Sequence, residues 1–159
     1  MNMVSVLDME TEVLSKDFFN YLKDFEVMRS IRYQDFFTLL LLEPDEGFDN
    51  ISDLKALAHI LRDEFRMTDI IGRINYFCFG IILPHADIKG SFMAGERVRK
   101  RVEDYLFPER QRRTISLGGA CFPTNVTSSD NLIPLAEQMM KMARDDGGNS
   151  LCFPKEEFC

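Results

Sequence analysis

Apolar residues recur along the chain with the periods of helices and strands. Ser15 can cap a helix, and five apolar positions behind it recur at steps of three and four residues. These positions are Phe18, Leu22, Phe25, Met28 and Ile31. We expect this stripe to pack on the rest of the protein.

A continuous apolar run follows at residues 35–42 and ends before Glu43 and Pro44. The run is too short for a typical helix, so it predicts a strand that is covered on both faces. We expect this strand to be central in a sheet. Ser52 can cap a second helix, which has one apolar face and ends at Arg66.

Two apolar segments at residues 70–74 and 77–83 are broken at Asn75 and Tyr76 and predict a β-hairpin. Beyond the hairpin, the same periods predict two helices and two strands. In chain order they are a helix at 88–106, a strand at 114–122, a helix at 132–143 and a strand at 150–153.

The predicted order is therefore helix, strand, helix, strand, strand, helix, strand, helix, strand. This order indicates an α/β (α+β) fold with a mixed sheet of about five strands, one antiparallel hairpin and flanking helices. A chain of 159 residues fits one domain. We expect that domain to span residues 1–159, with residues 1–9 as a frayed lead-in or lead-in helix and residues 154–159 as a tail.

The formal net charge of −7 argues against a general nucleic-acid binder, because affinity for phosphate backbones needs many Lys and Arg contacts. An anionic ligand must then meet a local cluster of cations. Hydrophobic residues make up 45% of the chain and charged residues 28%, which is typical of a soluble globular protein. The sequence shows neither a signal-peptide pattern nor an apolar run of membrane-spanning length.

None of the four cysteines belongs to a C-x-x-C pair, and Cys78 and Cys121 lie inside apolar runs. We therefore expect buried structural thiols, a reducing compartment and a cytoplasmic location. His59 and His85 belong to no metal-ligand pattern, so we expect no metal site.

The hairpin segment contains four features whose spacing needs no insertion or deletion to match a known pattern: Asp69, Arg73, residues 75–79 and Leu83-Pro84. The spacing resembles the signature of the GGDEF domain of diguanylate cyclases: Asp, three residues, Arg, one residue, Gly-Gly-Asp/Glu-Glu-Phe and a strand ending in Leu-Pro. Weaker matches in the same order lie at residues 8–19, 95–99, 114–118 and 136–149. The resemblance implies a sheet like that of nucleotidyl cyclases and the polymerase palm.

The resemblance also implies that the cyclase residues are missing. The family joins two GTP molecules with metal ions that neutralise phosphate charge. Its two glycines fall on Asn75 and Tyr76. Its acidic pair falls on Phe77 and Cys78, which are not plausible magnesium ligands, and its first-strand Asp falls on Glu43.

The chain after Glu43 is too short for the family segment that recognises guanine. We expect Glu43 to be a loop carboxylate. We expect no catalytic residue and no cofactor, with magnesium relevant only if residual cyclase activity exists.

A second family site is retained. The family binds cyclic di-GMP through Arg-x-x-Asp five residues before the signature, where Arg66 and Asp69 stand, and a further family arginine falls on Arg97. A guanidinium can donate two parallel hydrogen bonds to guanine, and a carboxylate can accept from guanine N1–H and the N2 amine. Without the resemblance, Arg66 and Asp69 would be an exposed ion pair worth at most about 1 kcal/mol.

We therefore expect a catalytically inactive GGDEF-like domain that binds cyclic di-GMP and acts as a receptor or regulatory module. One alternative is a dimerisation or protein-docking module without a nucleotide, and a further one is residual diguanylate cyclase activity. A homodimer stays open, and the downstream protein or sensor domain is not identified by the sequence.

Overall fold

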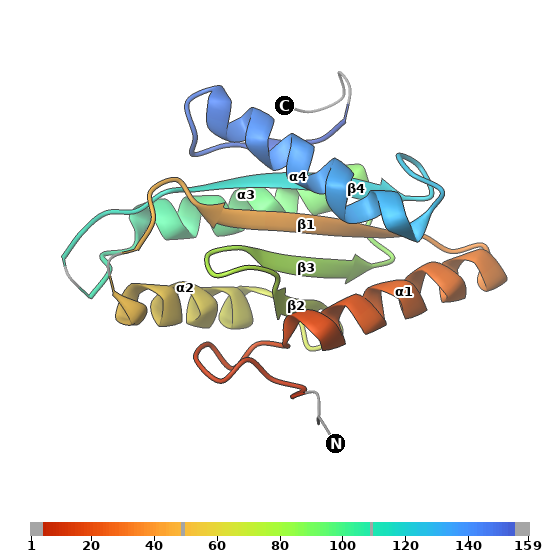
Figure 1. Ribbon diagram of the computed structural model, residues 1–159. Helices are drawn as coiled ribbons and strands as arrows, with labels where there is room; N and C mark the ends of the chain where they lie inside the picture. The colour runs from red at the N-terminus through yellow and green to blue at the C-terminus, as the bar shows by residue number, and fades with distance from the viewer. Residues whose placement is uncertain (1–4, 49, 109, 155–159) are drawn as a thin grey trace.

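The computed structural model describes residues 5–154 except 49 and 109 (Figure 1). Its helices and strands follow one another in the predicted order. They are α1 (Lys16–Tyr33), β1 (Phe37–Pro44), α2 (Ile51–Glu64), β2 (Ile70–Arg73), β3 (Phe79–Pro84), α3 (Ile88–Asp104), β4 (Ile115–Phe122), α4 (Ser129–Asp145) and β5 (Leu151–Cys152).

The five strands form one mixed sheet in the order β2-β3-β1-β4-β5. β1 pairs antiparallel with β3 on one side and with β4 on the other, so the prediction of a central strand is confirmed. β2 and β3 form the predicted antiparallel hairpin, and β4 and β5 run parallel. The predicted α/β class with a five-stranded mixed sheet and flanking helices is therefore correct.

Two apolar layers cover the sheet, one on each face (Figure 1). Leu40 and Leu42 face the layer built with α2 and α3, whereas Leu39 and Leu41 face the layer built with α1 and α4. All four leucines are fully buried, because side chains along a strand alternate between faces and both faces are covered. This explains why the strand is apolar without alternation.

Local signals at the helix ends are only partly confirmed. The Ser15 side chain accepts a hydrogen bond from the Phe18 N–H, as its predicted capping role requires. The prediction that Ser52 caps α2 is wrong, since Asn50 caps this helix by accepting from the Asp53 N–H at 2.9 Å. An Asn at this position has the same acceptor geometry as Ser, and it precedes the first apolar helical residue.

The predicted inward stripe of α1 is also wrong. Phe25, Met28 and Ile31 are exposed, whereas Phe19 and Val27 are buried on the opposite side. Phe19 fixes this orientation because its ring fills the space over two glycines of the hairpin. A Cβ atom added at Gly72 would lie 2.6 Å from the Phe19 side chain, and one at Gly80 would lie 2.8 Å from it.

Polar residues share the buried side of α1 because they pair with one another. Glu26 accepts from Arg29 at 3.0 Å, and Arg29 also pairs with Asp35 at 2.8 Å. These ion pairs allow the helix to turn a partly charged face toward the sheet. The spacing of apolar residues alone therefore cannot show that the partly charged face of this helix is buried and its apolar face is exposed.

The predicted lead-in helix is absent from the described part of residues 1–9. Leu7 instead forms an antiparallel bridge with Leu14, and Asp8 accepts from the backbone and hydroxyl of Thr11. Most of the predicted tail, residues 155–159, lies outside the described residues. Within the described ranges, none of the helices combines the length and the hydropathy needed to cross a bilayer.

Candidate functional site

The β2–β3 hairpin has a different set of candidate residues at each end. In the register of the sheet, Phe79 pairs with Leu42, and Pro84 pairs with Phe37. The turn before Phe79 therefore lies near Glu43, while Pro84 lies at the start of β1. A six-residue strand spans roughly 20 Å, so the two ends are separate sites.

Arg66 and Asp69 belong to the tight turn between α2 and β2. The Arg66 N–H donates to Asp69 Oδ2 at 2.9 Å, and the Asp69 N–H donates to the Arg66 carbonyl oxygen at 3.0 Å. The backbone therefore fixes the spacing of the two side chains. Among the described residues the Arg66 guanidinium has no ion-pair partner, so it is available to a ligand.

Arg97 approaches this turn from α3. Its Nε–H donates to Glu64 at 2.7 Å, and Glu64 also pairs with Arg101 at 2.8 Å. The Arg101 hydrogen bond and that of Arg97 hold the pKa of Glu64 below its usual value, although burial raises it. Arg97 is thus positioned by a carboxylate while its terminal nitrogens point to no partner within the described ranges.

A cavity of about 470 Å³ lies at this end of the hairpin, and Arg66, Asp69 and Arg97 all line it. Phe36, before β1, and His85, after β3, line the same cavity. The His85 ring contacts Phe36 edge to face, with 6.5 Å between ring centres. The cavity therefore combines two arginines with three carboxylates, those of Glu64, Asp69 and Asp87, and with the rings of Phe36, Phe65 and His85. Its arginines and rings can pair with and stack on a purine ligand.

Asp69 is a titratable group whose pKa is raised by this environment. Burial raises its pKa above the usual value of 3.8, and the backbone hydrogen bond and the charges of Arg66 and Arg97 only partly oppose that effect. A guanine that donates two hydrogen bonds to the carboxylate would favour its charged form.

The opposite end of the hairpin is a closed turn over residues 74–78. The Cys78 carbonyl accepts from the Ile74 N–H at 2.7 Å. Arg73 stabilises the turn, because its guanidinium donates to the Tyr76 carbonyl at 2.9 Å and pairs with Asp8 at 3.0 Å. The strands are consequently shorter than predicted on both sides of the turn.

Phe77 turns toward the core on the α2 face. Its ring contacts the Tyr76 ring edge to face at 4.7 Å and the Phe48 ring at 6.3 Å. Phe48 is buried and packs on Phe107 at 5.7 Å. An aromatic cluster therefore fills the space beside Phe77, the residue that the sequence resemblance aligns with the first acid of the family signature.

Cys78 and Glu43 lie side by side between the sheet and α4. Burial, followed by the charge of Glu43, raises the pKa of the Cys78 thiol to about 12, so the group is neutral near pH 7. Glu43 is part of β1 and forms an ion pair with Arg144 of α4, so the prediction of a loop carboxylate is wrong. Across the part of the chain that the structure describes, no three His, Cys, Asp or Glu side chains form a group suited to a metal ion.

Four further residues belong to these two sites and are not predicted from the sequence: Arg144, Phe48, Phe36 and His85. Arg144 lies in α4, 101 residues after Glu43, and nothing local links the two. Phe36 and His85 flank the strands β1 and β3, and the antiparallel pairing of those strands was the available signal.

A family model of the diguanylate cyclase GGDEF domain matches residues 5–150. The chain therefore belongs to the GGDEF domain family. The uncharacterized protein YhcK of Bacillus subtilis (strain 168) is 32% identical over 108 residues, which cover 65% of this chain and 30% of that protein. The chain thus matches less than a third of the length of this relative.

Two solved structures have the same fold. The GGDEF domain of DgcB from Caulobacter crescentus, determined in complex with c-di-GMP, has a TM-score of 0.89 at 15% identity and covers 98% of this chain and 99% of that one. The FimX GGDEF domain from Pseudomonas aeruginosa has a TM-score of 0.85 at 22% identity and covers 93% and 99%. At these identities the likeness concerns the fold alone.

Proposed function

We propose that this GGDEF domain is catalytically inactive and binds cyclic di-GMP at Arg66, Asp69 and Arg97, as a receptor or regulatory module. The observation that carries the proposal is the shared cavity: Arg66 and Asp69 from the α2–β2 turn and Arg97 from the middle of α3 all line about 470 Å³. Each has a hydrogen-bonding role toward guanine or phosphate. The c-di-GMP complex of the DgcB GGDEF domain supports the choice of ligand.

The residues at the family's metal positions do not fit a magnesium ion. Magnesium prefers oxygen ligands in near-octahedral geometry. Phe77 offers no donor atom, and Cys78 offers a neutral thiol with a pKa of about 12. Glu43 is neutralised by Arg144. These features support a lost cyclase activity, and we derive no catalytic step through a metal.

Isothermal titration with cyclic di-GMP tests the proposed ligand site. Arg66→Ala should abolish measurable heat or weaken binding by at least roughly tenfold, because it removes a charge-assisted, bidentate donor. Arg112→Ala is the matched control, since Arg112 is exposed, lies outside the cavity and donates to a backbone carbonyl. No heat with the parent protein, or equal binding by Arg66→Ala, would refute the proposal.

A second assay tests inactivity separately. The protein is incubated with GTP and either magnesium or manganese, and cyclic di-GMP is quantified by chromatography. We expect no product above a protein-free control. Product formation would establish the residual cyclase alternative and would leave the ligand site to be judged by the titration.

A further inference from the structure

The exposed face of α1 carries four large, mostly apolar side chains. Tyr21, Phe25, Met28 and Ile31 are 63%, 54%, 69% and 64% exposed. Four side chains of this size, each more than half exposed, present on the order of 500 Å² of mostly apolar surface. That is as much as the largest patch on a typical monomer, and such patches mark interaction sites.

The exposed face of α1 has the spacing of a helix–helix seam. Steps of three, four, three and four residues separate Phe18, Tyr21, Phe25, Met28 and, at the end of the row, Arg32. This is the a/d spacing of a coiled coil, which one helix presents to another helix with the same spacing. α1 has 18 residues and is therefore about 27 Å long, enough for such a contact.

Charges at the two ends of the stripe select the direction of the second helix. Asp17 and Arg32 are exposed, and within the described residues neither forms an ion pair. In an antiparallel pair, Asp17 of each copy lies opposite Arg32 of the other, and the helix dipoles oppose one another favourably. A parallel pair would instead place like charges together.

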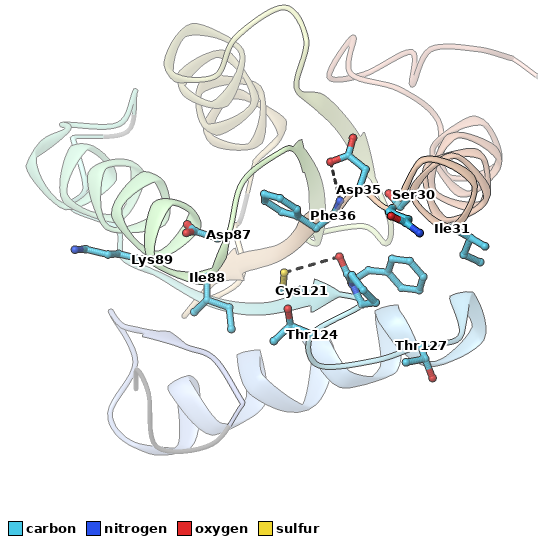
Figure 2. Close-up of a pocket in the computed structure, with 13 residues that line it drawn as sticks. Ser30, Ile31, Asp35, Phe36, Asp87, Ile88, Lys89, Cys121, Thr124 and Thr127 are labelled. Atoms are coloured by element: carbon cyan, nitrogen blue, oxygen red, sulfur yellow. Dashed lines mark hydrogen bonds between the residues drawn. The ribbon is translucent and has the colours of Figure 1, made fainter.

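A cavity of about 860 Å³ extends the same face beyond the C-terminal end of α1. Figure 2 shows Ile31 on α1 at its rim, with Phe36 and Ile88 across the opening. In the antiparallel arrangement, Phe18 of a second copy lies opposite Ile31, beside this opening. The apolar surface therefore continues where the second helix begins.

We propose that the α1 face binds a second copy of this chain as an antiparallel, two-fold symmetric helix pair. A symmetric pair buries this patch on both copies. The buried surface is then on the order of 1,000 Å² in total, which is the lower limit for a specific interface. Tyr21 then lies opposite Met28 of the other copy. The proposal does not rest on nucleotide binding, because none of the α1 residues lines the cavity with Arg66 and Asp69, although Phe36 borders both that cavity and the opening beside α1.

Sedimentation velocity without nucleotide, from micromolar to submillimolar concentration, tests the proposal. The parent chain should dimerise reversibly. Phe25→Glu and Met28→Glu should each raise the dimer dissociation constant by roughly a hundredfold or more, because each places a charge in the seam. Met93→Glu is the matched control: Met93 is 62% exposed on α3, and its variant should dimerise like the parent.

A charge exchange tests the direction of the helices. Asp17→Arg and Arg32→Asp should each weaken the dimer, and the double variant should regain most of the loss because the opposite charges meet again. Circular dichroism on each variant shows that the monomer is folded. A monomeric parent, a dimer insensitive to Phe25→Glu and Met28→Glu, or a double variant weaker than either single one would overturn the proposal.

Discussion

The guanidinium of Arg144 pairs with the carboxylate of Glu43, the residue that the sequence resemblance aligns with the family's first-strand Asp. A helix near the C-terminus thus supplies a fixed positive charge to the end of the central strand. Both side chains keep partial contact with water, so the pair neutralises the site without being a buried salt bridge.

Glu43→Gln should lower the free energy of unfolding by about 1 kcal/mol or less, because partly exposed ion pairs contribute little. Urea unfolding measures this change, with Glu46→Gln, an exposed loop carboxylate, as the matched control. Affinity for cyclic di-GMP should stay the same, since Glu43 lies at the far end of the hairpin. A change in affinity would mean that the two ends are coupled.

Binding of cyclic di-GMP should weaken in acid as Asp69 takes up a proton. Burial raises the pKa of Asp69, so the loss begins at a higher pH than for an ordinary Asp and approaches tenfold per pH unit below that pKa. Titration calorimetry over a pH series measures it. Asp69→Asn should bind more weakly and without this pH dependence; an unchanged pH profile in Asp69→Asn would contradict the assignment.

The raised pKa of Asp69 has the opposite effect on folding: it stabilises the native state in acid, where it weakens ligand binding. An Asp whose pKa is raised by folding binds a proton more tightly in the native state, so its contribution favours folding below the unfolded pKa. That contribution is lost as the pH rises through the folded value. Asp69→Asn should therefore flatten the pH dependence of stability in the acidic range.

Cys78 should resist alkylation in the native protein. Its thiol is buried and has a pKa of about 12, so the reactive thiolate is scarce at pH 8. Iodoacetamide treatment followed by peptide mass spectrometry should show little modification at Cys78 in buffer and complete modification in urea. Rapid labelling in buffer would mean that the hairpin turn opens.

Asp53 and Arg113 form an ion pair that is almost fully removed from water. They are 0% and 6% exposed and are 3.3 Å apart. Arg113→Met should cost roughly 3–5 kcal/mol of unfolding free energy, because it strands a buried carboxylate. The double variant Asp53→Leu with Arg113→Met should recover most of that loss in urea unfolding. A small loss of unfolding free energy in Arg113→Met would contradict this account, as would a double variant that is no more stable than Arg113→Met.

Local patterns predicted most of the fold. The order of helices and strands and the central place of β1 follow from short apolar runs and their periods. Element ends were less predictable, since β1 begins at Phe37 and the hairpin turn takes up residues 74–78. These ends depend on Asp35, which accepts from the Phe36 N–H, and on Arg73, which donates to the Tyr76 carbonyl, and the pattern of apolar positions does not contain these hydrogen bonds. The extent of the domain, residues 1–159, stays a prediction.

The two candidate sites differ in what the sequence could determine. Arg66 and Asp69 are three residues apart, so a tight turn brings them together by chain geometry alone. Arg97 reaches the same cavity only because α3 packs beside α2. The partner of Glu43 was likewise invisible, because packing of α4 on β1 and β4 decides which side chain arrives there.

The sequence by itself determined the family and the fold class, because both are properties of neighbouring residues. The replacement of the signature's glycines and acidic pair by residues 75–78 stays a prediction. Only the tertiary structure decided which face of α1 is buried. The stripe with Phe25 and Met28 has the stronger apolar pattern, yet Phe19 fills the space above Gly72 and Gly80, and that packing fixes the helix the other way round. Shape complementarity between distant segments thus outweighed the hydrophobic period.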